Sequence, residues 1–315
     1  MASPTPELLL DFPNFVRLFK DGTIERLGGT EIVPPSTDPI TGVQSKDAVI
    51  DQETGVNARL YIPKTTNPNH KKLPLLIYFH GGGFVIETAF SPVYHNHINS
   101  LANEAQVVVV SVNFRRAPEH FLPIAYDDSW VAIMWIAAHS KGGGPEVWLN
   151  NYVDFERVFF SGDSAGANIA HNMAIRVGVE KPHGFKLVGI TLIHAYFTGK
   201  QPIGSECEDV VGKATFDKLW LFVCPTSSGS DDPWINPFMN PNFSKLGCDK
   251  VLVCVAEKDS LRNRGWYYKE ELEKSGWGGV VEVMQDEEEG HLFHLYKPTC
   301  DKAVAMLKRL AAFMN

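Results

Sequence analysis

Five short, almost unbroken apolar runs constrain the fold of this chain more than any other feature. They read LPLLIYF (73–79), QVVVVSVNF (106–114), RVFFSG (157–162), KLVGITLIH (186–194) and KVLVCVAE (250–257). Runs of this length are typical of central strands buried on both faces, as in parallel sheets. Helical patterns follow at 123–139, 165–178 and 265–276. This alternation predicts an α/β fold with a mostly parallel, doubly wound central sheet.

The two ends of the chain complete this picture. Residues 15–27 alternate around Asp21-Gly22, which predicts a hairpin. The polar, Pro-rich stretch 34–47 is expected to be a loop, and 56–63 a strand. A final helix is predicted over 301–314, where one apolar face is formed by Val304, Leu307, Leu310 and Met314.

The chain contains no internal repeat and no low-complexity linker, so we expect one domain over residues 1–315. The stretch from about 196 to 242 is rich in Trp, Phe and Pro and poor in strand pattern. We expect it to form a cap over the carboxyl edge of the sheet, together with residues from about 1 to 40.

Composition and charge narrow the class of partner. Hydrophobic residues make up 44% and charged residues 21%, as in ordinary globular proteins, and the formal net charge is −8. This charge argues against nucleic acid or an anionic membrane as partner and favours a neutral or apolar small molecule. The oligomeric state stays open.

Several features predict a cytoplasmic protein. The N-terminal stretch has no basic region before Leu8-Leu9-Leu10, so we do not expect a signal peptide, and no apolar run reaches transmembrane length. The five cysteines are odd in number and lack metal-type spacing, which indicates free thiols in a reducing compartment.

Ser164 is the first candidate for chemistry. It is the serine of a G-x-S-x-G pattern, Gly162 to Gly166, placed between a predicted strand and a predicted helix. In that context the serine is forced into a tight, strained turn that exposes its hydroxyl as a nucleophile. The alternative is a serine that only caps the following helix, and the pattern alone would favour it. Two further elements are therefore needed.

The first of these is a set of amides to receive the negative charge that builds on an attacked carbonyl oxygen. His80-Gly81-Gly82-Gly83 follows a predicted strand and matches the glycine loop of lipases and esterases. A plain flexible turn would normally need only one glycine. The presence of both motifs, each at a strand end, favours the catalytic interpretation.

The second element is a base with an orienting acid, which follow the serine in the order acid, then histidine. Asp259 ends the predicted strand KVLVCVAEKD (250–259), and His291 lies in a loop after a further predicted strand. Glu257 and His294 are the rival acid and base. We favour Asp259 because it lies further into the loop, and His291 because a helix is expected to begin at His294.

Other polar residues have structural explanations. His80 is expected to shape the glycine loop by hydrogen bonding, and His171 and His194 to be packed in apolar segments. The acidic run from Asp286 to Glu289 is expected to be a solvated loop, since consecutive acids cannot converge on one cation without a turn. No metal site or organic cofactor is therefore predicted.

The chain as a whole resembles the plant carboxylesterases, a branch of the α/β-hydrolases similar to hormone-sensitive lipase. The matching stretches span nearly its full length: VRLFKDGTIERL, HGGGFVIETAFSPVYH, NFRRAPEH, GDSAGANIAHN, VAEKDSLRNRGWYY and HLFHLYKPTC. The resemblance implies an α/β-hydrolase fold with a helical cap to which the N-terminal segment contributes. It also implies Ser164, Asp259 and His291 as catalytic triad and the amides of Gly82, Gly83 and Ala165 as oxyanion hole.

The resemblance also limits the function. Gibberellin receptors of this family lack the catalytic histidine, so His291 argues against a hormone receptor. Some members are 2-hydroxyisoflavanone dehydratases or cyclases, which stay open as alternatives. We expect a carboxylesterase acting on small apolar esters, although Ala195 stands where the family has proline. Aromatic residues near the cap predict an apolar pocket, although each could equally belong to the core: Phe84, Phe197, Trp220 and Phe222.

Overall fold

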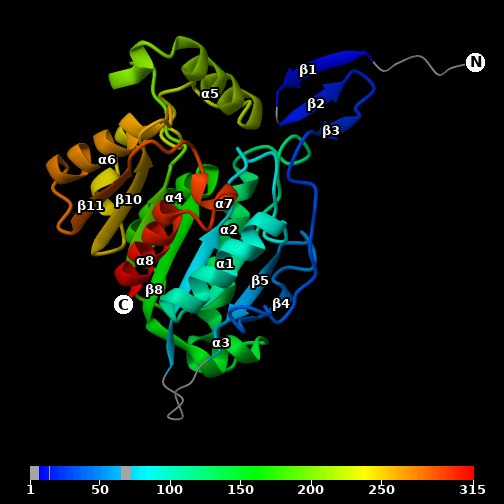
Figure 1. Cartoon of the computed structure of the whole chain (residues 1–315), viewed down its shortest axis with the longest axis vertical. Helices are drawn as coiled ribbons and strands as arrows, with labels where there is room; N and C mark the ends of the chain where they lie inside the picture. The colour runs from blue at the N-terminus through cyan, green and yellow to red at the C-terminus, as the bar shows by residue number, and fades with distance from the viewer. Residues whose placement is uncertain (1–6, 14, 65–71) are drawn as a thin grey trace, which may run out of the picture.

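The computed structural model describes residues 7–13, 15–64 and 72–315. Its strands form two sheets, one of three strands and one of eight (Figure 1). The predicted cap residues 1–6 and 14 lie outside the described residues. Within those residues, no helix is both long and apolar enough to cross a membrane.

The eight-stranded sheet follows the order β11-β10-β9-β8-β6-β7-β5-β4. Its neighbours from β7 to β11 are parallel, whereas β4 and β5 are antiparallel at one edge. The doubly wound, mostly parallel sheet predicted from the apolar runs is confirmed. The strands are β4 (Gln44–Val49), β5 (Asn57–Ile62), β6 (Leu73–Phe79), β7 (Val108–Asn113), β8 (Val153–Asp163), β9 (Leu187–Ile193), β10 (Lys250–Ala256) and β11 (Val280–Asp286).

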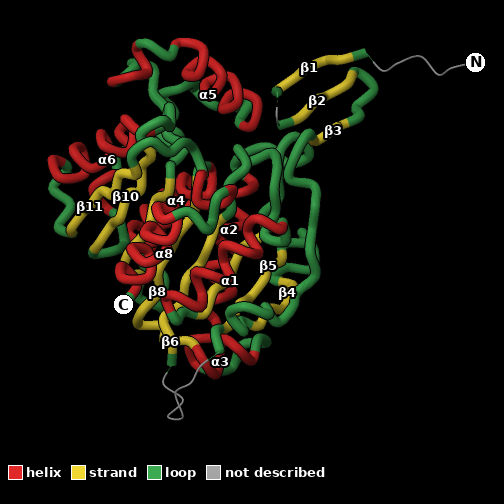
Figure 2. The backbone as a smooth tube through the Cα atoms, in the orientation of Figure 1, coloured by secondary structure: helices red, strands yellow, loops and turns green. Residues whose placement is uncertain are grey.

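Helices cover both faces of this sheet (Figure 2). Along β6, Leu75 and Ile77 pack in the core that contains helices α2, α4 and α6, whereas Leu76 and Tyr78 pack against α1 and α8. This alternation explains why the run is apolar throughout. The helices are α1 (Pro92–Ala105), α2 (Ile124–Ala137), α3 (Val147–Tyr152), α4 (Ala165–Glu180), α5 (Val210–Val223), α6 (Arg262–Lys274), α7 (Phe293–Tyr296) and α8 (Asp301–Met314).

The N-terminal segment forms strands rather than helix. β1 (Leu8–Phe12), β2 (Val16–Phe19) and β3 (Ile24–Arg26) pair antiparallel, and the turn between β2 and β3 contains the predicted Asp21-Gly22. This sheet and helix α5 lie at the same end of the molecule in Figure 1, and Phe12 contacts Phe222 of α5 with ring centroids 5.0 Å apart. The division into one domain and a cap over about 1–40 and 196–242 stays an interpretation.

Two local predictions were only partly right. Most of the stretch 34–47 is irregular as expected, but its end belongs to edge strand β4, whose solvated face hides the strand pattern. In α8, Leu310 and Met314 of the predicted face are buried and Leu307 packs half-buried against the core. The buried face also includes Ala303, Met306 and Phe313, which were not predicted.

Candidate active site

Ser164 lies at the turn between β8 and α4, with φ 51° and ψ −117°. Glycines make this turn possible, because a Cβ on Gly166 would lie 1.9 Å from the carbonyl oxygen of Phe79. Ser164 occupies the N-cap position of α4, yet its side chain makes no capping hydrogen bond. The helix-cap alternative is therefore not the arrangement seen.

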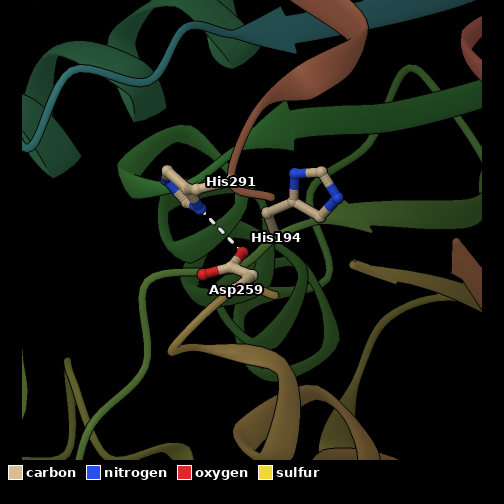
Figure 3. A group of neighbouring side chains, drawn as sticks. All are labelled: His194, Asp259 and His291. Atoms are coloured by element: carbon tan, nitrogen blue, oxygen red, sulfur yellow. Dashed lines mark hydrogen bonds and ion pairs between the residues drawn. The ribbon is translucent and has the colours of Figure 1, made fainter. Parts of the chain in front are cut away.

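The Ser164 hydroxyl instead faces His291. Its Oγ lies 3.1 Å from Nε2 of His291, and Nδ1 of His291 lies 2.7 Å from Oδ2 of Asp259 (Figure 3). Because Nδ1–H donates to a carboxylate, the neutral ring has an unprotonated Nε2 that can accept the serine proton. The structure thus brings together three residues that are far apart in the sequence.

The charges of this group are coupled. Burial disfavours the imidazolium of His291, but the charge and hydrogen bond of Asp259 outweigh burial and raise the pKa of His291 above 6.5. Burial opposes ionisation of Asp259 too, yet His291 and the amide of Leu261 lower the pKa of this carboxyl. Asp259 is thus held as an anion that orients and polarises the ring.

The glycine loop after β6 lies beside Ser164. Gly82 and Gly83 have φ values of 95° and 61°, which residues with a side chain rarely adopt. Among the described residues, neither amide donates to a backbone carbonyl. The amide of Ala165 stands at the first position of α4, where no carbonyl of the helix can receive it. Gly82 and Gly83 line the same cavity as Ser164, and Ala165 follows Ser164 directly in the chain.

A buried network behind the nucleophile ties the glycine loop to strand β8. Tyr78 and Tyr94 donate hydrogen bonds of 2.8 Å and 2.7 Å to the two carboxylate oxygens of Asp163, and Tyr94 also accepts the amide of Gly81. Burial raises the pKa of Asp163 to about 6, although both tyrosines oppose this shift. Sequence reasoning did not identify this network, because the partners lie on three separate elements.

The rival residues are held elsewhere. Glu257 accepts the amide of Glu288, and His294 is buried with its ring against His97, 5.0 Å between centroids. The predicted hydrogen bond of His80 within the glycine loop is present, from Nδ1 to the carbonyl of Gly81 at 2.8 Å. His171 bonds the hydroxyl of Tyr268.

His194 lies beside the candidate triad, which sequence reasoning did not foresee. Donor atoms of His194, Asp259 and His291 lie within 4.8 Å of one another, as a metal site would require. However, Nδ1 of His291 bonds Asp259, and Nδ1 of His194 accepts the amide of Leu292. Nε2 of His194 has no partner among the described residues, but both nitrogens of His291 bond protein groups, so we assign no metal to the group.

A cavity of about 550 Å³ opens onto Ser164 and His291. Its walls come from the glycine loop, the β1–β2 segment and α5, and they are mainly apolar. Of the two alternatives left open for the aromatic residues near the cap, the structure supports the core: Phe84, Phe197 and Trp220 are buried there, and Phe222 packs against Phe12. The aromatic lining residues are Phe12, Phe15, Tyr94, Tyr196, Phe216 and Tyr296.

Comparison with known proteins agrees with this geometry. A family model described as alpha/beta hydrolase fold matches residues 76–295. The chain is 48% identical to probable carboxylesterase 2 of Arabidopsis thaliana, over 100% of this chain and 99% of the relative. It is 43% identical to the 2-hydroxyisoflavanone dehydratase of Glycyrrhiza echinata, over the full length of both.

Solved structures give the same likeness. A hyperthermophilic esterase from the archaeon Pyrobaculum calidifontis superposes with a TM-score of 0.71 at 26% identity, covering 88% of this chain and 86% of that one. The similarity therefore extends over most of both chains.

Proposed function

Because the chain belongs to the plant carboxylesterase branch of the α/β-hydrolase family, we propose that it is a serine carboxylesterase. The observation that carries this proposal is the continuous hydrogen-bonded series from Asp259 through His291 to the Ser164 hydroxyl. In this series the acceptor nitrogen of a neutral imidazole faces the one hydroxyl that lies at a strained strand-to-helix turn.

The proposed reaction has two halves. His291 takes the Ser164 proton as Oγ attacks the ester carbonyl, and the amides of Gly82, Gly83 and Ala165 stabilise the oxyanion. His291 then gives its proton to the departing alcohol, which leaves an acyl-enzyme. In the second half a water molecule loses its proton to His291 and attacks the acyl carbon. The bond from the acyl carbon to Oγ then breaks, Ser164 takes the proton back from His291, and the acid is released. Asp259 stabilises the imidazolium in both halves.

The cavity supports small, mainly apolar ester substrates without negative charge. Its walls are largely apolar, but Glu87 lines it together with Tyr296. Burial, followed by the charge of Glu87, raises the pKa of Tyr296, and both side chains line the cavity. A substrate carboxylate would meet like charge there, at a cost that an apolar ester avoids.

A panel of p-nitrophenyl esters tests this proposal. Neutral acyl groups of increasing length should be turned over, whereas a matched ester with a terminal carboxylate should react at least about tenfold more slowly in kcat/KM. Glu87→Gln should recover much of that difference and leave the neutral esters unchanged. A protein that hydrolyses no ester of the panel, while it is folded, would contradict the proposal.

The similarity to 2-hydroxyisoflavanone dehydratase supports one alternative function, in which the protein is a lyase that eliminates water from its substrate. A 2-hydroxyisoflavanone substrate assayed beside the ester panel separates the two functions. Dehydration with no ester turnover would favour the lyase, and ester turnover without dehydration the esterase.

The expected partner is thus a small-molecule ester. We also propose a cytoplasmic location, which is supported by the five cysteines: all are free thiols, as is usual in a reducing compartment.

A further inference from the structure

His194 occupies an unusual position for a buried histidine. It follows the last residue of β9 at the carboxyl edge of the sheet and has φ 48°, a left-handed conformation that residues other than glycine rarely adopt. Its own amide donates to the carbonyl of Cys254 in β10 at 2.9 Å. The backbone is thereby fixed between two central strands, and the ring is only 1% exposed. Strained backbone held this firmly often marks a functional position.

The ring of His194 receives the loop that carries His291. Nδ1 accepts the amide of Leu292, the residue directly after His291, at 3.0 Å. Leu292 is itself left-handed, with φ 57°, and is 8% exposed. If Nδ1 were removed, the backbone amide of Leu292 would be buried without a hydrogen-bond acceptor. The free-energy cost of such a buried, unpaired amide is large enough to shift the loop.

Only a neutral His194 can play this part, because both nitrogens of an imidazolium are donors. Three titratable groups face its ring: Asp259, His291 and His294. Burial lowers the pKa of His194 to about 3, with Asp259 opposing and His291 adding to this effect. The ring therefore remains an acceptor across the pH range in which His291 titrates.

We propose that His194 is a positioning residue for the reaction, which holds the His291 imidazole against Ser164 by accepting the amide of Leu292. Two anchors then define the place of His291. Asp259 orients its ring from the side chain, and His194 fixes its backbone from the next residue. Figure 3 shows His194 beside the bonded pair; it acts on His291 through the chain rather than through direct contact with Ser164.

The test compares two amides at position 194. In His194→Asn the side-chain oxygen lies close to the place of Nδ1 and can accept the Leu292 amide, whereas in His194→Gln it lies one bond further out. The proposal rests on the proposed esterase function, so kcat and KM for a neutral ester are measured per folded molecule. His194→Gln should lose about 10²-fold in kcat with KM within about twofold, as expected for a displaced base. His194→Asn should keep at least about tenfold more activity than His194→Gln.

His294→Leu serves as the matched control. Its ring is equally buried and contacts His194, but both of its nitrogens lack a partner among the described residues. It should change kcat by less than about threefold. Equal kcat for His194→Asn and His194→Gln, or an equal loss in His294→Leu, would overturn the proposal, because burial alone would then explain the effect.

A second measurement does not depend on turnover or on which ester is cleaved. The downfield proton resonance of His291 Nδ1–H, bonded to Asp259, should persist in His194→Asn and shift or broaden in His194→Gln. An unchanged resonance in both variants would overturn the positioning role even if the protein proved to have no esterase activity. If one variant does not fold, the resonance and kcat of the other, compared with those of the unaltered protein and His294→Leu, decide the question.

Discussion

His291 and His294 lie three residues apart, yet their surroundings give them different chemistry. His291 has a carboxylate on one nitrogen and a hydroxyl on the other. Burial, followed by the nearby histidines, holds the pKa of His294 well below 6.5, and its nitrogens have no partner among the described residues. Of the two histidines, only His291 lies beside a hydroxyl whose proton it can accept, that of Ser164. Only His291 also bonds a carboxylate, that of Asp259, which can stabilise the resulting imidazolium.

Substitution of these two histidines should therefore give unequal results. His291→Ala should lower kcat by about 10³-fold to 10⁶-fold, as loss of a triad base does, whereas His294→Ala should cost less than about tenfold in a folded protein. Steady-state kinetics with a neutral ester, at concentrations corrected by circular dichroism, make the comparison. The reverse order of effects would mean that the loop register is wrong.

The pH dependence of kcat/KM tests the role of Asp259. His291 must be neutral to accept a proton, so kcat/KM should rise with pH through one ionisation. Its midpoint should lie above 6.5, because Asp259 outweighs burial and raises the pKa of His291. Asp259→Asn removes that countercharge, so the midpoint should move to lower pH and kcat should fall by up to about 10⁴-fold. If the midpoint does not move and the rate stays near normal, Asp259 is not the orienting acid, and Glu257 is the next acid to test.

At the scale of elements, a buried ion pair connects the segment after β9 to helix α6. Arg264 binds both oxygens of Glu206 at 2.7 Å and 2.6 Å, and both side chains are almost fully buried. The same guanidinium donates to the carbonyl of Gln201. Glu206 precedes α5 in the chain, and Arg264 belongs to α6, the helix that follows Asp259. The ion pair therefore attaches the segment before α5 to α6.

Removal of one partner should be worse than removal of both. Glu206→Met or Arg264→Met alone leaves a buried charge unpaired, which should lower the free energy of unfolding by about 3–5 kcal/mol. The double variant Glu206→Met/Arg264→Met should recover a substantial part of that loss. Urea unfolding of the four proteins measures the coupling, and strictly additive losses would show that the pair contributes little as a pair.

The elements predicted well from the sequence are those whose own residues carry the pattern. β6, β7, β9 and β10 are mainly apolar because both faces are covered, and the Asp-Gly pair at 21–22 is by itself a turn signal. Helices α1 and α5 were not recognised. α1 buries polar residues such as His95 and Asn99 on its inner face, which weakens its apolar pattern. α5 exposes the apolar residues Val210 and Val211, so apolar side chains occur on its outer face too and its amphipathic pattern is weak.

The same distinction holds for the candidate site. The positions of Ser164, Asp259 and His291 at strand ends were predictable, because parallel strands bring their carboxyl ends to one edge. Their catalytic roles stay predictions. The pocket lining and the contact from His194 to Leu292 depend on loops that meet only in three dimensions. The residue pattern within any one segment of the sequence does not predict such contacts.

For the whole molecule, buried histidines predict a loss of stability in acid. Burial lowers the pKa of His80, His171 and His194 to about 3 and that of His97 to about 4, and His294 is lowered as well. The unfolded chain takes up these protons near pH 6.5, so each such histidine should cost about 1.4 kcal/mol per pH unit below that value until its folded pKa is reached.

Two carboxyls and one histidine gain stabilising contributions at lower pH instead. Asp163 and Asp286 have pKa values raised to about 6, so between pH 6 and 4 they favour the folded state as pH falls. His291, whose pKa is raised, stabilises the fold below pH 6.5 and loses this contribution as pH rises through its folded pKa. Below pH 6.5 the contribution of His291 is fully present and no longer changes, so the five histidines named above outnumber the two carboxyls that oppose them. The melting temperature should therefore fall between pH 6.5 and 4, and less steeply in a folded His171→Phe variant; a flat profile would contradict the neutral burial of these rings.

The central claim is that Ser164 is the activated nucleophile, and covalent labelling tests it most directly. The full-length protein is treated with a fluorophosphonate, and its peptides are analysed by mass spectrometry. One adduct is predicted, on the peptide that contains Ser164, and it should be absent from Ser164→Ala and strongly slowed in His291→Ala. Labelling of another serine, or an adduct that persists in Ser164→Ala, would contradict the assignment.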